Sequence, residues 1–142
     1  MTTLTGTDDV MNVGQVLKWN NKTKLDFWKK GSSCNAIKGT DGSVFHPDLQ
    51  TTEKLYLFNR DLCQSLPLVF QKEVVSQDVP GYRFVPPEDV FSPDNPENKC
   101  FCMSEPCNVP KGLFNMSACQ FDSPTLISWP HFFQVSLEDY RC

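Results

Sequence analysis

One run of the 142-residue sequence decides its fold class: Leu66-Pro67-Leu68-Val69-Phe70-Gln71-Lys72-Glu73-Val74-Val75. A second run, Tyr82-Arg83-Phe84-Val85, follows it closely. Both are rich in the β-branched and aromatic residues that favour strands. The turn formers Asp78-Val79-Pro80-Gly81 stand between them. The sequence therefore predicts strands over 66–75 and 82–85, separated by a turn at 78–81.

Runs of the same kind recur along the chain, at Val10–Trp19, Lys54–Phe58 and Thr125–Trp129. Turn formers separate them, at Lys38–Gly42 and Ser92–Pro96. Short helical turns are expected to begin at Pro86–Asp89, because proline suits the first helical position, and at Ser136–Asp139. We predict a mostly β fold with short helices, in which long connections favour part of a barrel or sandwich over a simple meander.

The composition is that of a globular chain. Hydrophobic residues make up 39% and aromatic residues 12%, while 11 prolines and 7 glycines indicate many turns and few long helices. With 13 basic and 17 acidic residues, the net charge is -4. Proteins that bind nucleic acid need an excess of Lys and Arg to neutralise phosphates, so we expect no nucleic-acid partner.

Seven cysteines and two glycosylation sequons favour the secretory route. The sequons begin at Asn21 and Asn115, and neither has proline at its middle position. The cysteines are Cys34, Cys63, Cys100, Cys102, Cys107, Cys119 and Cys142. Disulfides are the favoured interpretation, with one cysteine left over, and spacing alone does not decide which cysteines pair.

A metal site is the alternative use of these cysteines. It would combine Cys100, Cys102 and Cys107 with His46 or His131. Structural zinc sites prefer other spacings, and the sequence contains no Cys-x-x-Cys redox motif. We therefore expect no metal and no other cofactor.

The N-terminal segment does not match a chain built for the secretory route. Met1–Asp9 has neither the basic nor the apolar region of a signal peptide. Apolar runs such as Leu66–Phe70 fall far short of the roughly 20 residues that span a bilayer. We expect residues 1–142 to be part of a longer extracellular or lumenal domain, without a transmembrane segment of their own.

Several sequence blocks follow one another in a defined order along the chain. The blocks are Trp19-Asn20-Asn21-Lys22-Thr23, Asp26-Phe27-Trp28, Cys34-Asn35-Ala36-Ile37-Lys38-Gly39-Thr40-Asp41-Gly42, Phe45-His46-Pro47, Leu55-Tyr56-Leu57-Phe58, Asp61-Leu62-Cys63-Gln64-Ser65, Pro80-Gly81-Tyr82-Arg83-Phe84, Asn98-Lys99-Cys100-Phe101-Cys102, Gly112-Leu113-Phe114-Asn115-Met116-Ser117-Ala118-Cys119 and Ile127-Ser128-Trp129-Pro130-His131-Phe132. Each block alone is weak, but the ordered set covers nearly the whole chain and is highly specific. In order and spacing, the blocks resemble the class B scavenger receptors.

The resemblance implies a glycosylated ectodomain held between two membrane helices. That ectodomain is an irregular antiparallel β-barrel with a helical cap and an apolar tunnel, and this chain resembles its central-to-late part. The family's bridge pattern implies the disulfides Cys34–Cys100, Cys63–Cys119 and Cys102–Cys107, and it leaves Cys142 outside. The sequence departs from the family at Lys38, where an Asn would create a sequon, and at Gln64, where Arg is common.

Two groups of residues are candidates for ligand contact. The apolar strand residues are expected either to line a lipid tunnel or to fill the barrel, and they are Leu55, Leu57, Leu68, Phe70, Phe84 and Ile127. The basic residues are interpreted either as an anionic-ligand patch or as a solvated face beside inward-facing aromatic residues, and they are Lys18, Lys22, Lys24, Lys29 and Lys30. His46 and His131 are interpreted as packed, hydrogen-bonded residues rather than pH sensors.

We expect no enzyme, because the sequence contains no nucleophile elbow, zinc-protease helix or phosphate-binding loop. The resemblance implies cell-surface binding and uptake of lipids, fatty acids, lipoproteins or lipid-bearing particles such as apoptotic cells and microbes, and contact with anionic phospholipid surfaces. The full-length protein would be membrane-anchored, on the extracellular side of the plasma membrane. The alternatives are a lysosomal membrane receptor that carries a hydrolase, a secreted soluble relative, and a non-functional truncated product.

Overall fold

The computed structural model describes residues 1–104 and 107–136. The chain divides into two compact units, each made of segments that are distant in the sequence. Unit 1 comprises Met1–Thr23, Ile37–Asn59 and Ser65–Pro87. Unit 2 comprises Lys24–Ala36, Arg60–Gln64 and the chain from Glu88 onward.

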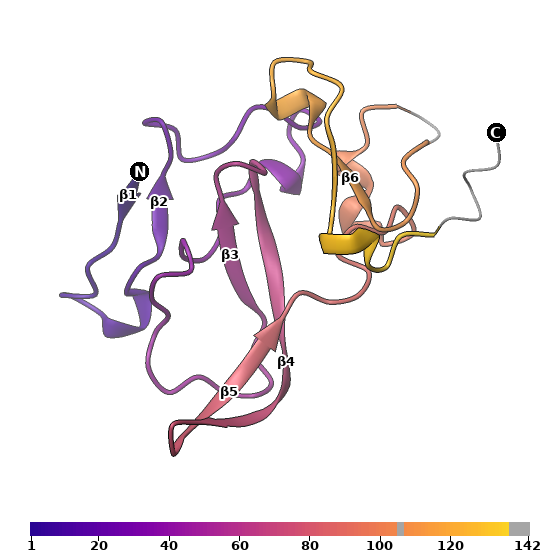
Figure 1. Cartoon of the computed structure of the whole chain (residues 1–142). Helices are drawn as coiled ribbons and strands as arrows, with labels where there is room; N and C mark the ends of the chain where they lie inside the picture. Colours follow the sequence, from indigo (N-terminus) through magenta and orange to yellow (C-terminus); the bar gives the residue numbers. More distant parts are fainter. Residues whose placement is uncertain (105–106, 137–142) are drawn as a thin grey trace. The chain divides into compact units, whose positions relative to one another are not determined.

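Unit 1 is built on a three-stranded sheet with the order β3-β4-β5. Strand β3 covers Leu55–Asn59, β4 covers Gln64–Ser76 and β5 covers Val79–Val85, and Figure 1 shows β4 and β5 as one long hairpin. A second, two-stranded sheet pairs β1 (Thr2–Thr3) with β2 (Val16–Lys18). The strands predicted at 54–58, 66–75 and 82–85 are therefore confirmed.

The turn predicted at 78–81 is wrong by two residues. Gln77 and Asp78 have φ values of 49° and 63°, and Ser76 pairs with Val79. Two left-handed residues between paired strands make a tight hairpin whose twist matches that of the sheet, so the turn centres on residues 77–78. Pro80 then lies within β5, which tolerates it because β5 is the edge strand.

Two further predictions of secondary structure are corrected by side-chain capping. Only Val16–Lys18 of the run at 10–19 is a strand, because Asp9 accepts a hydrogen bond from the Met11 amide and caps the 3-10 helix η1 (Val10–Asn12). The helical turn predicted at 86–89 is a non-helical turn at 88–91. The helix begins instead at Pro96, as η3 (Pro96–Phe101), where Asn95 accepts a hydrogen bond from the Glu97 amide at 2.9 Å.

Unit 2 consists of short elements. Strand β6 (Leu113–Asn115) pairs antiparallel with β7 (Leu126–Ser128), which lies within the run predicted at 125–129. Besides η3, the described part of unit 2 contains the 3-10 helices η2 (Ser33–Asn35), η4 (Ser117–Cys119) and η5 (Pro130–Phe132). Most of the helix start predicted at 136–139, and Cys142, lie outside the described residues.

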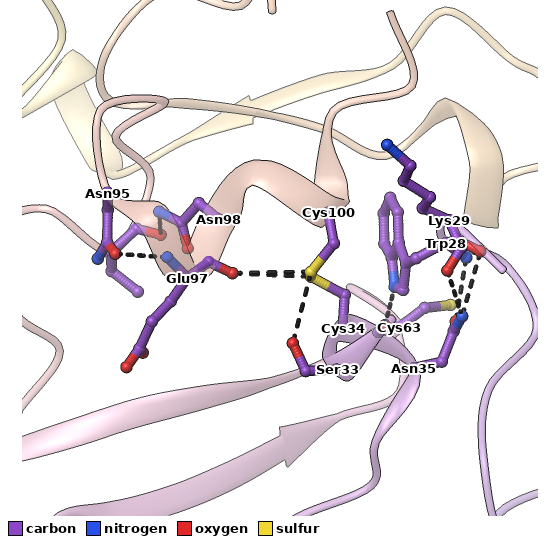
Figure 2. The surroundings of a disulfide bond; sticks show 11 residues. Trp28, Lys29, Ser33, Cys34, Asn35, Cys63, Asn95, Glu97, Asn98 and Cys100 are labelled. Carbon is purple, nitrogen blue, oxygen red and sulfur yellow. Dashed lines mark hydrogen bonds between the residues drawn. A yellow bond between two sulfur atoms is a disulfide. The ribbon is translucent and has the colours of Figure 1, made fainter. Parts of the chain in front are cut away.

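The core of unit 2 is a cluster of aromatic rings. Trp28, only 3% exposed, lies with its ring centroid 5.0 Å from that of Phe101 and 5.5 Å from that of Phe114. Phe91 continues the cluster, 5.5 Å from Phe114 and 5.3 Å from Trp129. The Trp28 indole N–H donates a hydrogen bond to the Cys63 carbonyl at 2.7 Å (Figure 2). The one polar atom of the buried indole therefore has a hydrogen-bond partner.

Three disulfides stabilise unit 2: Cys34–Cys100, Cys63–Cys119 and Cys102–Cys107. These are the pairs that the family resemblance implies, and all six cysteines belong to this unit. The predicted fold class, mostly β with short helices and stapled by disulfides, is confirmed, and the strands of each sheet pair antiparallel.

The disulfides are expected to contribute unequally to stability. Cys34–Cys100 spans 66 residues and Cys102–Cys107 spans 5. The loop-entropy relation assigns about 4 kcal/mol to the first and about 2 kcal/mol to the second. Urea denaturation followed by tryptophan fluorescence should therefore show a larger loss for the pair C34A/C100A than for C102A/C107A. Cys142→Ala, which removes a cysteine outside these bridges, is the control, and equal losses for the two pairs would contradict the prediction.

Candidate ligand-binding site

The apolar tunnel candidates do not all lie in one unit. Leu55, Leu57, Leu68, Phe70 and Phe84 lie in the β3-β4-β5 sheet of unit 1, whereas Ile127 lies on β7 of unit 2. Leu55 is buried, with 7% of its surface exposed, and the other five are half-buried. Leu55 is therefore a core residue, while the remaining strand residues present apolar surface that this chain does not fully cover.

The β4–β5 hairpin concentrates that surface in an aromatic face. Phe70 stands opposite Phe84 in the strand register, with ring centroids 6.0 Å apart. Tyr82 lies on the same side of β5, two residues away, and its ring centroid is 5.6 Å from that of Phe70. Tyr82 is 49% exposed. We call Phe70, Tyr82 and Phe84 the hairpin aromatic face.

Unit 2 holds a small apolar cavity of about 30 Å³. Its walls include Phe91, Phe101 and Phe114 of the aromatic cluster and the half-cystines Cys102 and Cys107. This volume suits a water molecule and is too small for an acyl chain. The cavity of unit 2 therefore does not enter the proposal for lipid contact.

Unit 1 contains a larger hollow of about 450 Å³, beside β3. Its residues are Gln15, Lys38, Gly39, Thr40, Phe45, His46, Glu53, Lys54, Leu55 and Tyr56. One wall is fixed by backbone contact, because the Thr40 amide donates to the Tyr56 carbonyl at 3.1 Å. Gly39 has φ +79°, and a Cβ there would lie 1.9 Å from the Tyr56 carbonyl oxygen, so only glycine allows this approach. We call this hollow the β3 hollow.

Charged groups line the β3 hollow. The Lys38 ammonium lies 5.0 Å and the Lys54 ammonium 5.8 Å from the Tyr56 ring centroid, within cation–π range. His46 Nε2 lies 3.2 Å from Glu53 Oε2. Strand alternation places Lys54 and Tyr56 on one face of the sheet. Lys38 is distant in the sequence, and no local pattern predicts that it lies beside them.

Next to this hollow, the Ser43 hydroxyl and amide both donate to Asp41, and these hydrogen bonds hold the pKa of that carboxyl below its ordinary value. The effect is local to an exposed turn. The two hydrogen bonds stabilise the loop that follows Gly39 and Thr40, and these two residues form the wall of the β3 hollow.

The five candidate lysines of the anionic-ligand patch are all exposed, but they belong to different units. Lys18 and Lys22 lie in unit 1, and Lys24, Lys29 and Lys30 lie in unit 2. The neighbouring aromatic residues face inward: Trp28 is buried, and the Trp19 ring is 6.3 Å from the Phe58 ring within unit 1. This arrangement has the features of the solvated-face interpretation, and the anionic-ligand patch stays a prediction.

The sequons differ in exposure. Asn21 is exposed in a two-residue turn, with φ +62°. Asn115 is half-buried, and its Oδ1 accepts hydrogen bonds from the Ser117 amide at 2.9 Å and the Ser117 hydroxyl at 2.6 Å.

The two histidines differ in their surroundings. His46 is packed and hydrogen-bonded, as interpreted. The same interpretation of His131 is wrong, because His131 is exposed, with φ +57°.

Within residues 1–104 and 107–136, no group of three or more His, Cys, Asp and Glu side chains is arranged to hold a metal ion. Across the same residues, no helix has the length and apolar character that a membrane crossing requires.

The chain is similar in sequence to two proteins named as membrane proteins and to one named as a scavenger receptor. It is 38% identical over 132 residues to lysosome membrane protein 2 of Mus musculus, covering 93% of this chain and 27% of that protein. It is 34% identical over 136 residues to scavenger receptor class B member 1 of Sus scrofa, covering 94% and 26%. For sensory neuron membrane protein 2 of Drosophila melanogaster the identity is 33% over 153 residues, covering 96% and 27%.

A sequence model of the CD36 family matches residues 1–140. The chain belongs to this family, the class B scavenger receptors, and the resemblance drawn from the sequence blocks is confirmed. It spans about a quarter of the length of the curated relatives it matches. The predicted localisation, the plasma membrane or alternatively the lysosomal membrane, agrees with both kinds of relative.

Proposed function

We propose that this chain forms part of the extracellular or lumenal domain of a membrane-anchored receptor that binds and takes up lipids, fatty acids or lipoproteins. In this proposal the hairpin aromatic face contributes to the wall that receives acyl chains. The role is one of binding rather than catalysis. The segment corresponds to the central-to-late part of the ectodomain, and the remainder of the receptor completes the ligand site.

The observation that carries the proposal is the half-exposure of the hairpin aromatic face. Large apolar side chains on a strand that only fills a protein core are buried, whereas Phe70 and Phe84 are only half-buried. Each CH₂ of an acyl chain that leaves water gains about 0.8 kcal/mol, so such a wall can supply lipid affinity without charged contacts. The name of a relative, scavenger receptor class B member 1, supports a receptor role.

Removing the aromatic face should weaken lipid binding. Phe70→Ser combined with Phe84→Ser is expected to raise the Kd for cis-parinaric acid, a fluorescent fatty acid, by about tenfold, because two half-buried rings would no longer contact the acyl chain. Fluorescence titration of the oxidised, secreted chain measures the Kd. Phe121→Ser is the matched control, since Phe121 is 99% exposed and belongs to unit 2. Unchanged affinity of the double variant would show that the face is not the wall.

Glycan occupancy tests the extracellular or lumenal side. We expect Asn21 to be fully glycosylated and Asn115 only partly, because an oligosaccharyltransferase needs an accessible amide, and Asn115 is half-buried with its side chain held by Ser117. Intact-mass measurement before and after treatment with peptide N-glycosidase should show that Asn21→Gln removes more glycan mass than Asn115→Gln. A secreted chain with no glycan on Asn21 would contradict the assignment.

A lysosomal receptor that carries a hydrolase is the second candidate function. It is favoured by the higher identity to lysosome membrane protein 2, 38%, than to scavenger receptor class B member 1, 34%. The two candidates differ in where the full-length protein resides at steady state. Surface biotinylation should label most of a plasma-membrane receptor, whereas co-localisation with a lysosomal marker and little surface label would establish the second candidate.

A further inference from the structure

A second hollow of unit 1, of about 840 Å³, is lined by the segment 46–50, by residues 73–75 of β4 and by residues 80–82 of β5. We call it the hairpin hollow. It shares Tyr82 with the hairpin aromatic face. We infer that the hairpin hollow binds the trimethylammonium group of a choline phospholipid whose acyl chain lies on that face. This inference rests on the proposed lipid-binding function and deepens it, because it names the class of lipid.

The first argument is the strand register, which puts an aromatic ring and a carboxylate side by side. Glu73 and Tyr82 are direct partners in the antiparallel pairing of β4 with β5. Direct partners point to the same face of a sheet, with Cβ atoms about 4.5 to 5.5 Å apart. On that face the Tyr82 ring centroid is 5.6 Å from that of Phe70. A cation that lies over the tyrosine ring is therefore within reach of the Glu73 carboxylate.

The second argument is the charge of the hairpin hollow. Glu73 is exposed, and among residues 1–104 and 107–136 its carboxylate has no hydrogen bond or ion pair. Asp48 is also exposed and lines the same hollow. The neighbouring register pair, Lys72 and Arg83, points to the opposite face because side chains alternate along a strand, and neither residue lines the hollow. The carboxylates therefore favour a cation over an anion.

His46 also lines the hairpin hollow but does not oppose a cation. Its Nε2 lies 3.2 Å from Glu53 Oε2, and its Nδ1 lies 2.8 Å from the Pro47 carbonyl. Any positive charge on the imidazole is therefore offset by the Glu53 carboxylate. Asp48 and Glu73 thus decide the charge that a ligand meets.

The third argument is the apolar surface beside the ring. Val75 and Pro80 form the next register pair on the face of Glu73 and Tyr82, and both line the hollow. Val75 is 71% exposed and Tyr82 is 49% exposed. Quaternary ammonium groups are recognised by aromatic rings, and their methyl groups contact apolar surface. The hollow therefore matches both the charge and the methyl groups of trimethylammonium.

The principal test compares two lipids that share an oleoyl chain and a phosphate. Lysophosphatidylcholine carries the trimethylammonium group, and lysophosphatidic acid does not. In isothermal titration calorimetry below micelle-forming concentrations, we expect the oxidised wild-type chain to bind lysophosphatidylcholine about tenfold more tightly. Glu73→Gln keeps the shape of the side chain and removes its charge. It should reduce this preference to less than about threefold, through weaker binding of lysophosphatidylcholine.

Three further variants separate a site from general charge. Asp78→Asn removes an equal charge from the turn of the same hairpin, where Asp78 is exposed and lies outside the hollow. Asparagine tolerates the φ of 63° at this position, so the preference should stay within about twofold of the wild type. Tyr82→Phe keeps the ring and should retain the preference, whereas Tyr82→Leu should lose it several-fold. Equal losses for Glu73→Gln and Asp78→Asn would overturn the inference, as would no loss for Glu73→Gln.

Choline chloride shows whether the ammonium group is recognised without its lipid. If millimolar choline displaces lysophosphatidylcholine, the hollow recognises the group itself. If it does not, the group is recognised together with the lipid that carries it. Either result supports the inference when the preference of the wild type is lost in Glu73→Gln. A wild type that binds cis-parinaric acid but binds both lysolipids equally would overturn this inference alone, whereas a wild type that binds no lipid at all would remove the proposed function and this inference with it.

Discussion

Unit 2 depends on covalent cross-links between segments that the sequence separates. Cys34–Cys100 joins the segment Lys24–Ala36 to the chain after Glu88, and Cys63–Cys119 joins Arg60–Gln64 to that same chain. The hydrogen bond from the Trp28 indole to the Cys63 carbonyl connects the two shorter segments directly (Figure 2). Each pair of segments is thus linked, and short elements that would not be stable alone, such as the three-residue β6, are held against the aromatic cluster.

Unit 1 contains none of the three disulfides and depends on backbone hydrogen bonds. Gly39 and Thr40 lie against β3 because the Val16 amide donates to Gly39, and the Thr40 carbonyl accepts from the Phe58 amide at 2.7 Å. These bonds connect β2, the segment at 39–40 and β3, and they give the β3 hollow a fixed wall. The glycine is required by geometry, since its missing Cβ is what lets the chain approach the Tyr56 carbonyl.

The sequence predicted the long strands because their composition is decisive. Leu66–Val75 and Tyr82–Val85 are rich in β-branched and aromatic residues, and tertiary contacts did not override that preference. The prediction from composition was wrong where one capping side chain decides the local structure. Asp9 caps a 3-10 helix inside a β-type run, and Asn95 caps a helix that begins at Pro96 rather than at Pro86. The three-residue β6 was missed because it forms by pairing with β7, whose residues lie 11 to 15 positions further along the chain, rather than through its own composition.

The same limit applies to the candidate site: local sequence predicts which residues lie on strands, and contacts between distant segments decide which of them come together. Phe70 and Phe84 were candidates from the sequence because they lie in predicted strands, whereas the grouping with Tyr82 appears only in the pairing of β4 with β5. The lysines of the β3 hollow were not foreseen, because Lys38 meets Tyr56 only when the segment at 38–40 docks on β3. The five lysines of the predicted anionic-ligand patch are close in the sequence, yet they are divided between the two units. In the proposed function the acyl chain meets the hairpin aromatic face of unit 1, whose strands are held by backbone hydrogen bonds rather than by any of the three disulfides.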